Sequence, residues 1–386
     1  MKILHVITSL NLEQGGPAQG LRNITSHYAA LGAKATVLTM DEANDDLGSV
    51  DHLTVITIGK GKGTFCYHPK LIKKLKSIAA EFDAVIVHGL WQYHGHAVRQ
   101  ALKHTNVPYY VFPHGMLDPY FKHAYPLKHL KKSVFWYLSQ YAVLRDAKAV
   151  LFTCEEEKRL AEASFSRYTV NPVVVNYGTN ITPIAQQASE DAFYSKYPTL
   201  KNKQIFLFLS RIHAKKGCDL LIKAFANALQ KNTNIHLVMA GPDHTGWKSE
   251  LVAIAKSMNA DTHITWTGML KNELKWSAIK AANVFILPSH QENFGISVAE
   301  ALALGTPVLI SNKVNIWREI EEMKAGLVED DTLAGTENLI SRWMALTNEE
   351  KSTIQQNAEK CFEQKFDIKQ ASKNIITQIK SDLRHD

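Results

Sequence analysis

The fold is decided by residues 284–310, which read VFILPSHQENFGISVAEALALGTPVLI. The apolar run Val284–Leu287 is typical of a strand buried on both faces, and a polar loop follows it. An Ala- and Leu-rich stretch beginning near Gly295 predicts a helix, and Pro307–Ile310 predicts a second buried strand. Strand, helix and strand in this order form a parallel βαβ unit, so we expect an α/β fold with a doubly wound sheet.

The same alternation of short apolar runs and amphipathic segments continues along the rest of the chain. In the first half, the expected strands are Lys2–Thr8, Lys34–Thr39, Leu53–Ile58, Ala84–His88, Tyr109–Phe112, Ala149–Thr153 and Val173–Val175. In the second half, they are Ile205–Leu209, His236–Ala240, His263–Trp266, Val284–Leu287 and Pro307–Ile310. The end of the chain is expected to be helical, with breaks near Thr347 and Phe366.

Length and composition favour two soluble domains. A chain of 386 residues is longer than one core usually organises. Hydrophobic residues make up 45% and charged residues 21% of the chain, which excludes a disordered or fibrous protein. The polar stretch Gln186–Lys203 separates the two strand series, so we expect one domain over residues 1–185 and another over 186–366.

Cysteine spacing and hydropathy indicate a cytoplasmic protein. The four cysteines are far apart and form no CxxC pair, which argues against a zinc site or a disulfide framework. The apolar stretch at the N-terminus is interrupted by His5 and is too short for a signal peptide. We find no segment near the ~20 apolar residues of a membrane span.

The positive charge of the chain is concentrated in its first half. The formal net charge is +7, and residues 60–148 contain 14 Lys and Arg against 4 Asp and Glu. Such a basic face would suit phosphate-bearing substrates, anionic lipid or nucleic acid. The chain has no RNP aromatics, helix-turn-helix pattern or zinc spacing, so we expect no nucleic-acid partner.

In each half of the chain, a loop with a possible phosphate-binding role follows the first strand. The loop in the first half contains glycines, and the loop in the second half is basic. Gly15, Gly16 and Pro17 lead into a helix, whose free amides favour an anion, although a plain tight turn is the alternative. This loop lacks the GxGxxG pattern of dinucleotide cofactors. In the second half, Arg211 and Lys216 could converge on a pyrophosphate, and a solvated basic loop is the alternative.

Two carboxylates occupy residues 284–310. Glu292 lies in the polar loop, and Glu300 falls among apolar positions of the helix. An unpaired buried carboxylate is costly, so Glu300 is expected to have partners such as ligand hydroxyls. The alternative is that Glu292 caps the helix and Glu300 is a surface glutamate. This would explain either residue alone, but it explains less well why both occur in this loop and helix.

Together these motifs resemble those of the retaining GT-B glycosyltransferases of family 4 (group 1). The two glutamates are similar to that family's two-glutamate signature, and Arg211 with Lys216 resembles its diphosphate clamp. Gly15 and Gly16 resemble its first phosphate-facing loop. Residues 175–180 are similar to its interdomain turn, with asparagine where proline would stand at position 176.

The resemblance implies two Rossmann-like domains facing each other across a cleft, with the last helix, about 367–386, packed on the first domain. It implies transfer of a sugar from a UDP- or GDP-sugar to a saccharide or lipid-linked saccharide, in bacterial surface polysaccharide biosynthesis. No metal is required, and no Asp-x-Asp metal signature is present. Retention would follow from front-side attack, with the leaving phosphate accepting the acceptor's proton. A phosphorylase or a sugar-nucleotide epimerase of the same fold remains an alternative.

The resemblance also implies roles for individual residues. Glu292 would bind sugar hydroxyls and Glu300 the ribose, while Arg211 and Lys216 would neutralise the leaving diphosphate. His114 would lie near the sugar in a catalytic role, with a satisfied interface histidine as the alternative, and His88 could contact the acceptor. The remaining donor-binding positions would be Gly268, Met269 and Leu270 near the base, and Asn293, Phe294, Gly295 and Ile296 at the helix entrance.

One segment of the basic region suits a membrane surface. Residues 119–138 contain Lys128, Lys131 and Lys132 beside the aromatic residues Phe135, Trp136 and Tyr137. An amphipathic helix of this kind could associate peripherally with an anionic membrane. The alternative is that the aromatic residues pack the helix onto its own sheet while the lysines face water.

Overall fold

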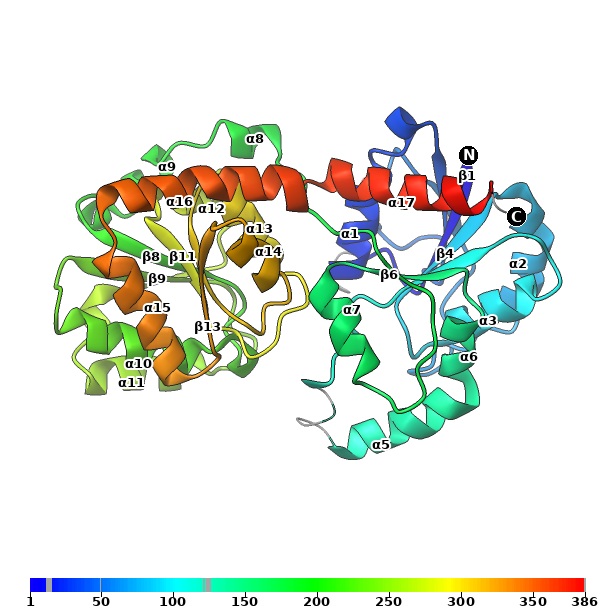
Figure 1. Cartoon of the computed structure of the whole chain (residues 1–386), viewed down its shortest axis with the longest axis horizontal. Coiled ribbons are helices and arrows are strands. Elements are labelled where there is room, and N and C mark those ends of the chain that lie inside the picture. The colour runs from blue at the N-terminus through cyan, green and yellow to red at the C-terminus, as the bar shows by residue number, and fades with distance from the viewer. Residues whose placement is uncertain (12–15, 49, 121, 123–125, 385–386) are drawn as a thin grey trace. The chain divides into compact units, whose positions relative to one another are not determined.

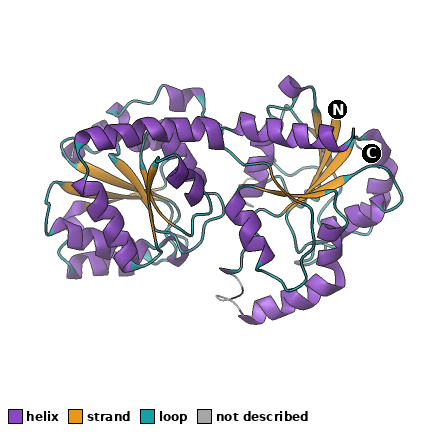
Figure 2. Ribbon diagram, in the orientation of Figure 1, coloured by secondary structure: helices purple, strands orange, loops and turns teal. Residues whose placement is uncertain are grey.

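The computed structural model describes residues 1–11, 16–48, 50–120, 122 and 126–384. The chain divides into two compact units (Figure 1). Unit 1 comprises Met1–Gly178 and Ile368–Asp386, and unit 2 comprises Thr179–Asp367. Each unit contains one parallel sheet with helices on both of its faces (Figure 2). The expected doubly wound α/β architecture is therefore confirmed in both halves of the chain.

Unit 1 is built on seven strands, all paired in parallel. The strands are β1 Lys2–Ile7, β2 Lys34–Thr39, β3 Thr54–Thr57, β4 Ala84–His88, β5 Tyr109–Phe112, β6 Ala149–Phe152 and β7 Pro172–Val174. The helices are α1 Gly16–Thr25, α2 Leu71–Ile78, α3 Tyr93–Leu102, α5 Pro126–Phe135, α6 Tyr141–Arg145, α7 Glu155–Glu162 and α17 Ile368–Asp382. A π-helical turn, Trp136–Gln140, joins α5 to α6.

The strand order in unit 1 is β3-β2-β1-β4-β5-β6-β7. The direction in which the strands are added reverses between β1 and β4, which makes this the topological switch point. β1 and β4 are apolar almost throughout because both faces of these strands are covered. Two histidines interrupt that pattern: His5 within β1 and His88 at the end of β4 are both buried.

The last helix belongs to unit 1 although it is separated from the rest of that unit in sequence. α17 lies beside α1 (Figure 1), and Ser372 Oγ donates a hydrogen bond to the carbonyl oxygen of Ile24. The Asn374 side chain donates to the carbonyl oxygen of Val175, close to where the chain leaves unit 1. Unit 1 therefore contains both ends of the chain.

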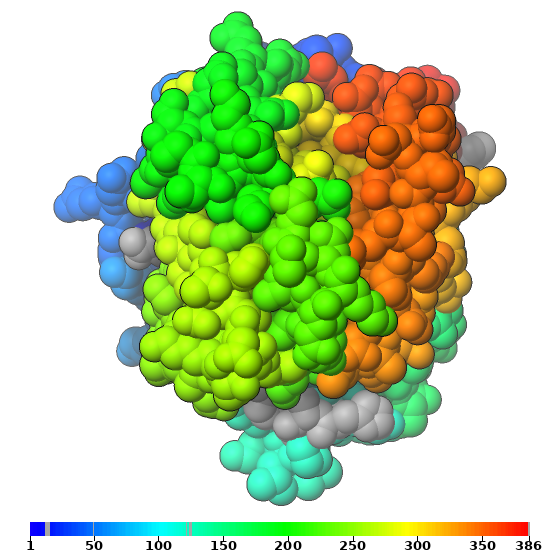
Figure 3. Space-filling view, turned by 90° about the vertical axis from the view of Figure 1, so that its left-hand side faces the viewer, coloured from blue at the N-terminus to red at the C-terminus, as the bar shows by residue number. Residues whose placement is uncertain are grey.

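Unit 2 has six parallel strands, one more than the sequence pattern indicated. The strands are β8 Gln204–Leu209, β9 Ile235–Ala240, β10 Ile264–Gly268, β11 Val284–Leu287, β12 Val308–Ser311 and β13 Gly326–Glu329. The helices are α8 Pro183–Gln186, α9 Asp191–Lys196, α10 Cys218–Leu229, α11 Lys248–Ser257, α12 Asn272–Ala281, α13 Ile296–Ala303, α14 Trp317–Glu322, α15 Leu333–Ala345 and α16 Asn348–Cys361. Figure 3 shows the outer layer of this unit, where α10 lies beside α15.

The strand order in unit 2 is β10-β9-β8-β11-β12-β13, so its switch point lies between β8 and β11. The unexpected strand, β13, is a half-buried edge strand that begins with a glycine. A Cβ at Gly326 would lie 2.0 Å from the carbonyl oxygen of Val308, so only glycine permits this pairing. A short, half-buried strand opened by glycine carries too weak an apolar signal to be recognised from sequence.

The division between the units falls at Gly178, whereas the sequence pattern suggested residue 185. Residue 185 lies within α8, which packs on α12 of unit 2. The expected helical breaks near the end of the chain are present. Thr347 caps α16 with a reciprocal capping box, and a π-helical turn ends at Phe366. None of the helices in the described part of the chain has the length and apolar character needed to cross a bilayer.

Candidate active site

The loop after β8 brings the expected basic pair of unit 2 to the switch point. A short 3-10 turn, Ala214–Lys216, is capped by the His213 ring nitrogen, which accepts a hydrogen bond from the Lys215 amide. Gly217 follows with φ of 64°, and a Cβ there would lie 2.1 Å from the carbonyl oxygen of Pro288. Glycine therefore lets this loop approach the end of β11.

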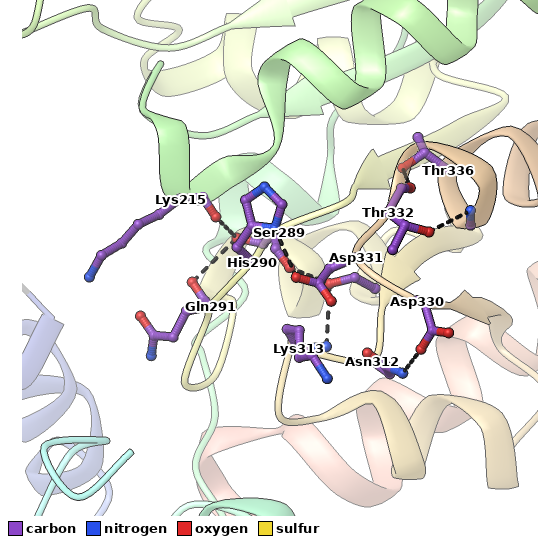
Figure 4. A network of polar contacts seen from close by, with 12 residues as sticks. Lys215, Ser289, His290, Gln291, Asn312, Lys313, Asp330, Asp331, Thr332 and Thr336 are labelled. Atoms are coloured by element: carbon purple, nitrogen blue, oxygen red, sulfur yellow. Dashed lines mark hydrogen bonds and ion pairs between the residues drawn. The ribbon is translucent and has the colours of Figure 1, made fainter. Parts of the chain in front are cut away.

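Hydrogen bonds connect the loops that follow β8 and β11 (Figure 4). The Lys215 carbonyl oxygen accepts from the Ser289 hydroxyl at 2.9 Å and from the His290 amide at 2.7 Å. The His290 ring in turn contacts Asp331 at 2.8 Å, which extends the network to the loop after β13. The backbone of the basic loop is thus held by a polar network rather than being a free surface turn.

Lys216 and Glu292, one from each loop, form an ion pair. The Lys216 side chain is 9% exposed and the Glu292 side chain 26%, so the lysine is largely covered and the glutamate is partly exposed. The backbone of Glu292 is held as well, because its amide donates to Lys313 and its carbonyl oxygen accepts from Asn315. Arg211 opens the same loop and is exposed. Two of the expected site residues are therefore in direct contact.

Glu300 lies on α13 and is buried, as its apolar sequence neighbours suggested. Its carboxylate is bound by the Lys275 ammonium of α12 at 2.7 Å, and that ammonium also lies 4.0 Å from the centroid of the Trp276 ring. Burial raises the pKa of Glu300, and Lys275 opposes that rise. The required partner of this carboxylate is thus a lysine that the sequence analysis did not single out.

The remaining expected donor-binding positions differ in what they expose. Met269 is 61% exposed just after β10, whereas Leu270 is buried. The Phe294 side chain is also buried and packs edge-on against Phe366. Gly295 has φ of 75° at the start of α13, where the positive φ favours glycine. Asn293 accepts a hydrogen bond from the Asn315 side chain at 3.4 Å.

The glycine loop of unit 1 is described only in part. Gly15 lies outside the described residues, and Gly16 is exposed as the first residue of α1. The Tyr177 hydroxyl donates to the Gly16 carbonyl oxygen at 3.3 Å. A Cβ at Gly20 would overlap that hydroxyl, at 1.2 Å, so the helix depends on glycine where Tyr177 packs against it.

His114 follows β5 in a strained backbone conformation. Its φ is 52°, a left-handed value that is costly for a residue with a side chain, and Gly115 follows with φ of 75°. The buried Glu157 holds this turn, because its carboxylate accepts from the Gly115 amide at 2.5 Å and from the Thr153 hydroxyl at 2.6 Å. Burial raises the pKa of Glu157, and these hydrogen bonds oppose the rise.

His114 is the end of a chain of three histidines from adjacent strands. His5 Nδ1 lies 2.9 Å from His88 Nε2, and His88 Nδ1 lies 3.0 Å from His114 Nε2. The rings stack, with centroids 5.2 Å and 5.3 Å apart. Phe112 covers the His114 ring at 4.6 Å. Because burial disfavours the charged form, the pKa of His5 and of His114 falls to about 3.

Unit 1 also contains a cavity of about 400 Å³, which is not lined by any of these three histidines. It is lined by Arg99, Lys103, Tyr109, Asp146 and Lys148, among others. Tyr109 begins β5, whereas His114 follows the end of that strand. The cavity therefore contains none of the expected site residues. Within the described ranges, no group of three or more His, Cys, Asp or Glu side chains is arranged to hold a metal ion.

His5, Glu157 and Lys275 are among the residues of these networks that were not predicted from the sequence. His5 carried a signal that was not used, since a histidine inside an apolar parallel strand needs a polar partner. Glu157 is one of three consecutive glutamates and Lys275 one of many lysines. For these two residues, no sequence signal separates them from their solvent-exposed counterparts.

Family models match both halves of the chain. The family described as "Glycosyl transferase 4-like domain" matches residues 15–178, and "Glycosyl transferases group 1" matches residues 190–360. The mannosylfructose-phosphate synthase of Agrobacterium fabrum is 28% identical over 133 residues, which are 33% of this chain and 29% of that protein. The D-inositol 3-phosphate glycosyltransferase of Corynebacterium urealyticum is 26% identical over 196 residues, 49% of this chain and 46% of the relative. The chain thus spans less than half the length of these curated relatives.

Solved structures share the fold over almost the whole chain. The sucrose-phosphate synthase of Thermosynechococcus elongatus superimposes with a TM-score of 0.76 at 18% identity, covering 100% of both chains. Anabaena Alr3699/HepE in complex with UDP and glucose superimposes with a TM-score of 0.74 at 18% identity, over 99% of this chain and 100% of that one. The two family matches together cover most of the sequence, and the fold agrees with them. The chain belongs to the group 1 glycosyltransferases, family 4, which have the GT-B fold.

Proposed function

We propose that this protein is a retaining, metal-independent glycosyltransferase that moves a sugar from a UDP- or GDP-sugar to a saccharide or lipid-linked saccharide acceptor. Unit 2 binds the nucleotide sugar, and unit 1 binds the acceptor. The observation that carries the proposal is the meeting of Lys216 and Glu292 at the switch point of unit 2. Open α/β sheets bind ligands at this point, beyond the carboxyl ends of their strands.

The chemistry of that point fits a sugar diphosphate. Lys216 and Arg211 offer two cations to the phosphates, and Glu292 offers a partly exposed carboxylate to sugar hydroxyls. Breaking the bond between the sugar and the diphosphate places charge on the leaving group, which preorganised cations stabilise. One lysine and one arginine in this role make a divalent metal unnecessary.

Glu300 is assigned to the ribose hydroxyls of the donor. Its carboxylate contacts the Lys275 ammonium, so the buried charge also has a partner within the protein. The exposed Met269 after β10 is assigned to the base, together with Gly268 and Leu270. The solved HepE structures contain UDP and UDP-glucose, which supports a nucleotide-sugar donor for a protein of the same fold.

The decisive experiment presents the protein with a panel of UDP-, GDP- and ADP-sugars, with and without EDTA. We expect one nucleotide sugar to raise the melting temperature, because a ligand that binds only the folded state stabilises it. The same donor should be hydrolysed slowly or transferred to an acceptor while EDTA is present. Phosphate-driven release of sugar would instead identify a phosphorylase, and conversion of the free nucleotide sugar would identify an epimerase.

We further propose that the protein acts at the cytoplasmic face of an anionic membrane, in surface polysaccharide synthesis. The supporting feature is an exposed apolar face along α5 and its π-helical continuation. Its members are Leu127, Leu130, Val134, Tyr137 and Leu138, each between 54% and 79% exposed. These positions recur at helical spacing, so they form one stripe, and the exposed residues Lys128 and Lys131 flank it.

The structure corrects the expected composition of this surface. Trp136 is fully buried, and its indole nitrogen donates to the Arg167 carbonyl oxygen at 2.9 Å. Lys132 lies over the Trp91 ring, 4.7 Å from its centroid. Trp136 and Lys132 therefore attach the helix to its own unit. For Trp136 this is what the alternative interpretation held, whereas Tyr137 is exposed. The apolar stripe that contains Tyr137 provides the outward face.

Co-sedimentation with vesicles tests the membrane proposal. The protein should bind phosphatidylglycerol vesicles at low salt and neutral vesicles weakly, because each basic residue near an anionic surface contributes about 1 kcal/mol. Changing Leu130 and Leu138 to Gln should reduce binding, as should changing Lys128 and Lys131 to Gln. Ile184→Gln is the matched control, since Ile184 is 53% exposed in unit 2. A wild-type protein that ignores anionic vesicles would make a soluble acceptor the better proposal.

A further inference from the structure

The histidine chain of unit 1 allows only two proton arrangements while its rings are neutral. Burial lowers the pKa of His88 well below its ordinary value, as it does for His5 and His114. A neutral imidazole has one N–H donor and one bare acceptor nitrogen. Each contact in the chain needs one donor and one acceptor, so the direction of one hydrogen bond dictates the direction of the other.

The two arrangements differ at the buried end of the chain. His5 Nε2 is buried and has no hydrogen-bond partner within the part of the chain that the structure describes. If the bonds ran from His114 towards His5, this nitrogen would carry a proton with no acceptor. If they run from His5 towards His114, it is a bare acceptor without a donor. The Tyr28 ring packs on His5, with centroids 5.6 Å apart, but its buried hydroxyl also has no hydrogen-bond partner among the described residues, so it does not accept a proton from His5 Nε2.

A neighbouring histidine shows which arrangement this core tolerates. His94 Nε2 lies 2.8 Å from the carbonyl oxygen of His88, and a carbonyl oxygen can only accept. His94 must therefore carry its proton on Nε2. Its buried Nδ1, for which the described ranges offer no hydrogen-bond partner, is then a bare acceptor. Orphaned buried N–H groups are rarer than acceptors without a donor, which agrees with this assignment.

We propose that His88, with His5 behind it, holds His114 as the neutral Nδ1–H tautomer, so that His114 acts as a hydrogen-bond donor and not as a general base. His5 Nδ1–H donates to His88 Nε2, and His88 Nδ1–H donates to His114 Nε2. The only nitrogen of His114 outside this chain is Nδ1, and it carries the proton. His88 and His5 are positioning residues, because they act on the ligand only through His114.

This inference rests on the proposed function in one respect, namely that His114 meets the sugar or the acceptor. In that reaction the bond between C1 and the diphosphate oxygen breaks, and a bond between C1 and the acceptor oxygen forms. The acceptor's proton goes to an oxygen of the departing diphosphate. His114 takes no proton, because its only basic nitrogen is already bound by His88 Nδ1–H. It donates a hydrogen bond to a ligand oxygen instead.

Nitrogen NMR of the full-length protein labelled with ¹⁵N-histidine tests the tautomer directly. Protonated and bare imidazole nitrogens have well-separated chemical shifts, and His114→Asn and His88→Asn assign the two signals by their loss. We expect a protonated Nδ1 and a bare Nε2 for both residues near neutral pH. A protonated Nε2 on His114 would overturn the proposal. The measurement needs no substrate, so it stands apart from any failure to find transferase activity.

Two substitutions at position 88 separate tautomer control from packing. His88→Asn can keep an N–H donor near the Nδ1 position, whereas His88→Leu keeps apolar volume and removes the donor. His88→Leu should give His114 a mixed tautomer population and lower kcat about tenfold, the scale of one lost hydrogen bond, with little change in the donor KM. His88→Asn should restore the Nδ1–H signal and most of the kcat.

His236→Leu is the control for losing a buried histidine, because His236 lies in unit 2, where its ring nitrogen contacts the Thr265 hydroxyl and its ring lies 6.3 Å from that of His263. It should leave the His114 signals unchanged. Equal loss of kcat in His88→Asn and His88→Leu, with the Nδ1–H signal intact in both, would show that His88 serves packing alone and would remove its positioning role.

Discussion

The two units place chemically opposite groups at equivalent places in their sheets. At the switch point of unit 1, His5 and His88 are buried, neutral and hydrogen-bonded to each other. At the switch point of unit 2, Lys216 and Glu292 are charged and paired, and Lys275 pairs with Glu300 on the helix that follows. The same doubly wound topology therefore supports a neutral network in one unit and an ionic network in the other.

This difference teaches how one fold is adapted to two kinds of ligand. A nucleoside diphosphate is an anion, and a site with preformed cationic side chains can bind it without an added metal cation. A sugar hydroxyl is neutral, and a neutral donor can bind it without the cost of burying an unpaired ion. The contrast between the neutral network of unit 1 and the ionic network of unit 2 can be tested by experiments whose expected free-energy changes range from large to small.

Acid should destabilise unit 1 more than unit 2. His5, His88 and His94 of unit 1 all have depressed folded-state pKa values, about 4 for His94, against 6.5 in the unfolded chain. Their neutral forms favour folding fully above pH 6.5, and this contribution is lost as the pH falls, by up to about 1.4 kcal/mol per histidine and pH unit. In the described part of unit 2, His236 is the only buried histidine whose pKa is lowered to a similar extent, to about 4.

Hydrogen exchange followed by mass spectrometry at pH 7 and pH 5.5, corrected for the intrinsic exchange rate, would compare the two units within one chain. Shifted carboxyl groups occur in both units, so they do not by themselves predict a difference in acid stability between the units. Glu157 of unit 1 and Glu300 of unit 2 both have raised pKa values, and Asp146 and Asp243 both have lowered ones. Equal loss of protection in the two units would contradict the contrast.

Removing a cation from the ionic network should damage catalysis strongly. Arg211→Ala or Lys216→Ala should each lower kcat/KM by about 10²-fold or more, the scale found when a charge-stabilising donor is deleted. The reaction should continue in EDTA. Initial rates with a nucleotide sugar as the varied substrate measure both effects.

Lys215→Ala is the matched control, because it removes one charge from the same loop while its side chain extends away from the network drawn in Figure 4. Its kcat/KM should stay close to that of the wild type. If EDTA abolished the reaction and Mn²⁺ restored it, the proposal that lysine and arginine replace a metal would have to be abandoned.

The two carboxylates of unit 2 should give different defects. Glu300→Ala should weaken binding of the donor and of the free nucleoside diphosphate together, about tenfold, because Glu300 is assigned to the ribose. Glu292→Ala should spare nucleoside diphosphate affinity but lower turnover and sugar discrimination. Calorimetry with the free diphosphate separates the two, and an equal loss of affinity in both variants would show that the roles are divided wrongly.

The strands were largely predictable because burial on both faces leaves a local mark. Ala84–His88 and Val284–Leu287 were expected from their apolar runs and are found at those bounds. β13 was missed because Gly326 and its half-buried neighbours give no such run. Among the site residues, Glu300 was predicted to be buried and to need a partner, but the identity of that partner, Lys275, was not.

The sequence by itself determined the elements of this protein, its repeated α/β order and its motif-bearing loops. Apolar runs, glycines and capping residues act over a few positions, so their effects can be recognised without knowing the neighbours in space. Tertiary structure alone decided the partners. His5, His88 and His114 are far apart in the chain and meet only because β1, β4 and β5 are adjacent in the sheet. Strand order follows from how the whole chain packs, so the proton arrangement of these histidines depends on contacts that no local segment contains.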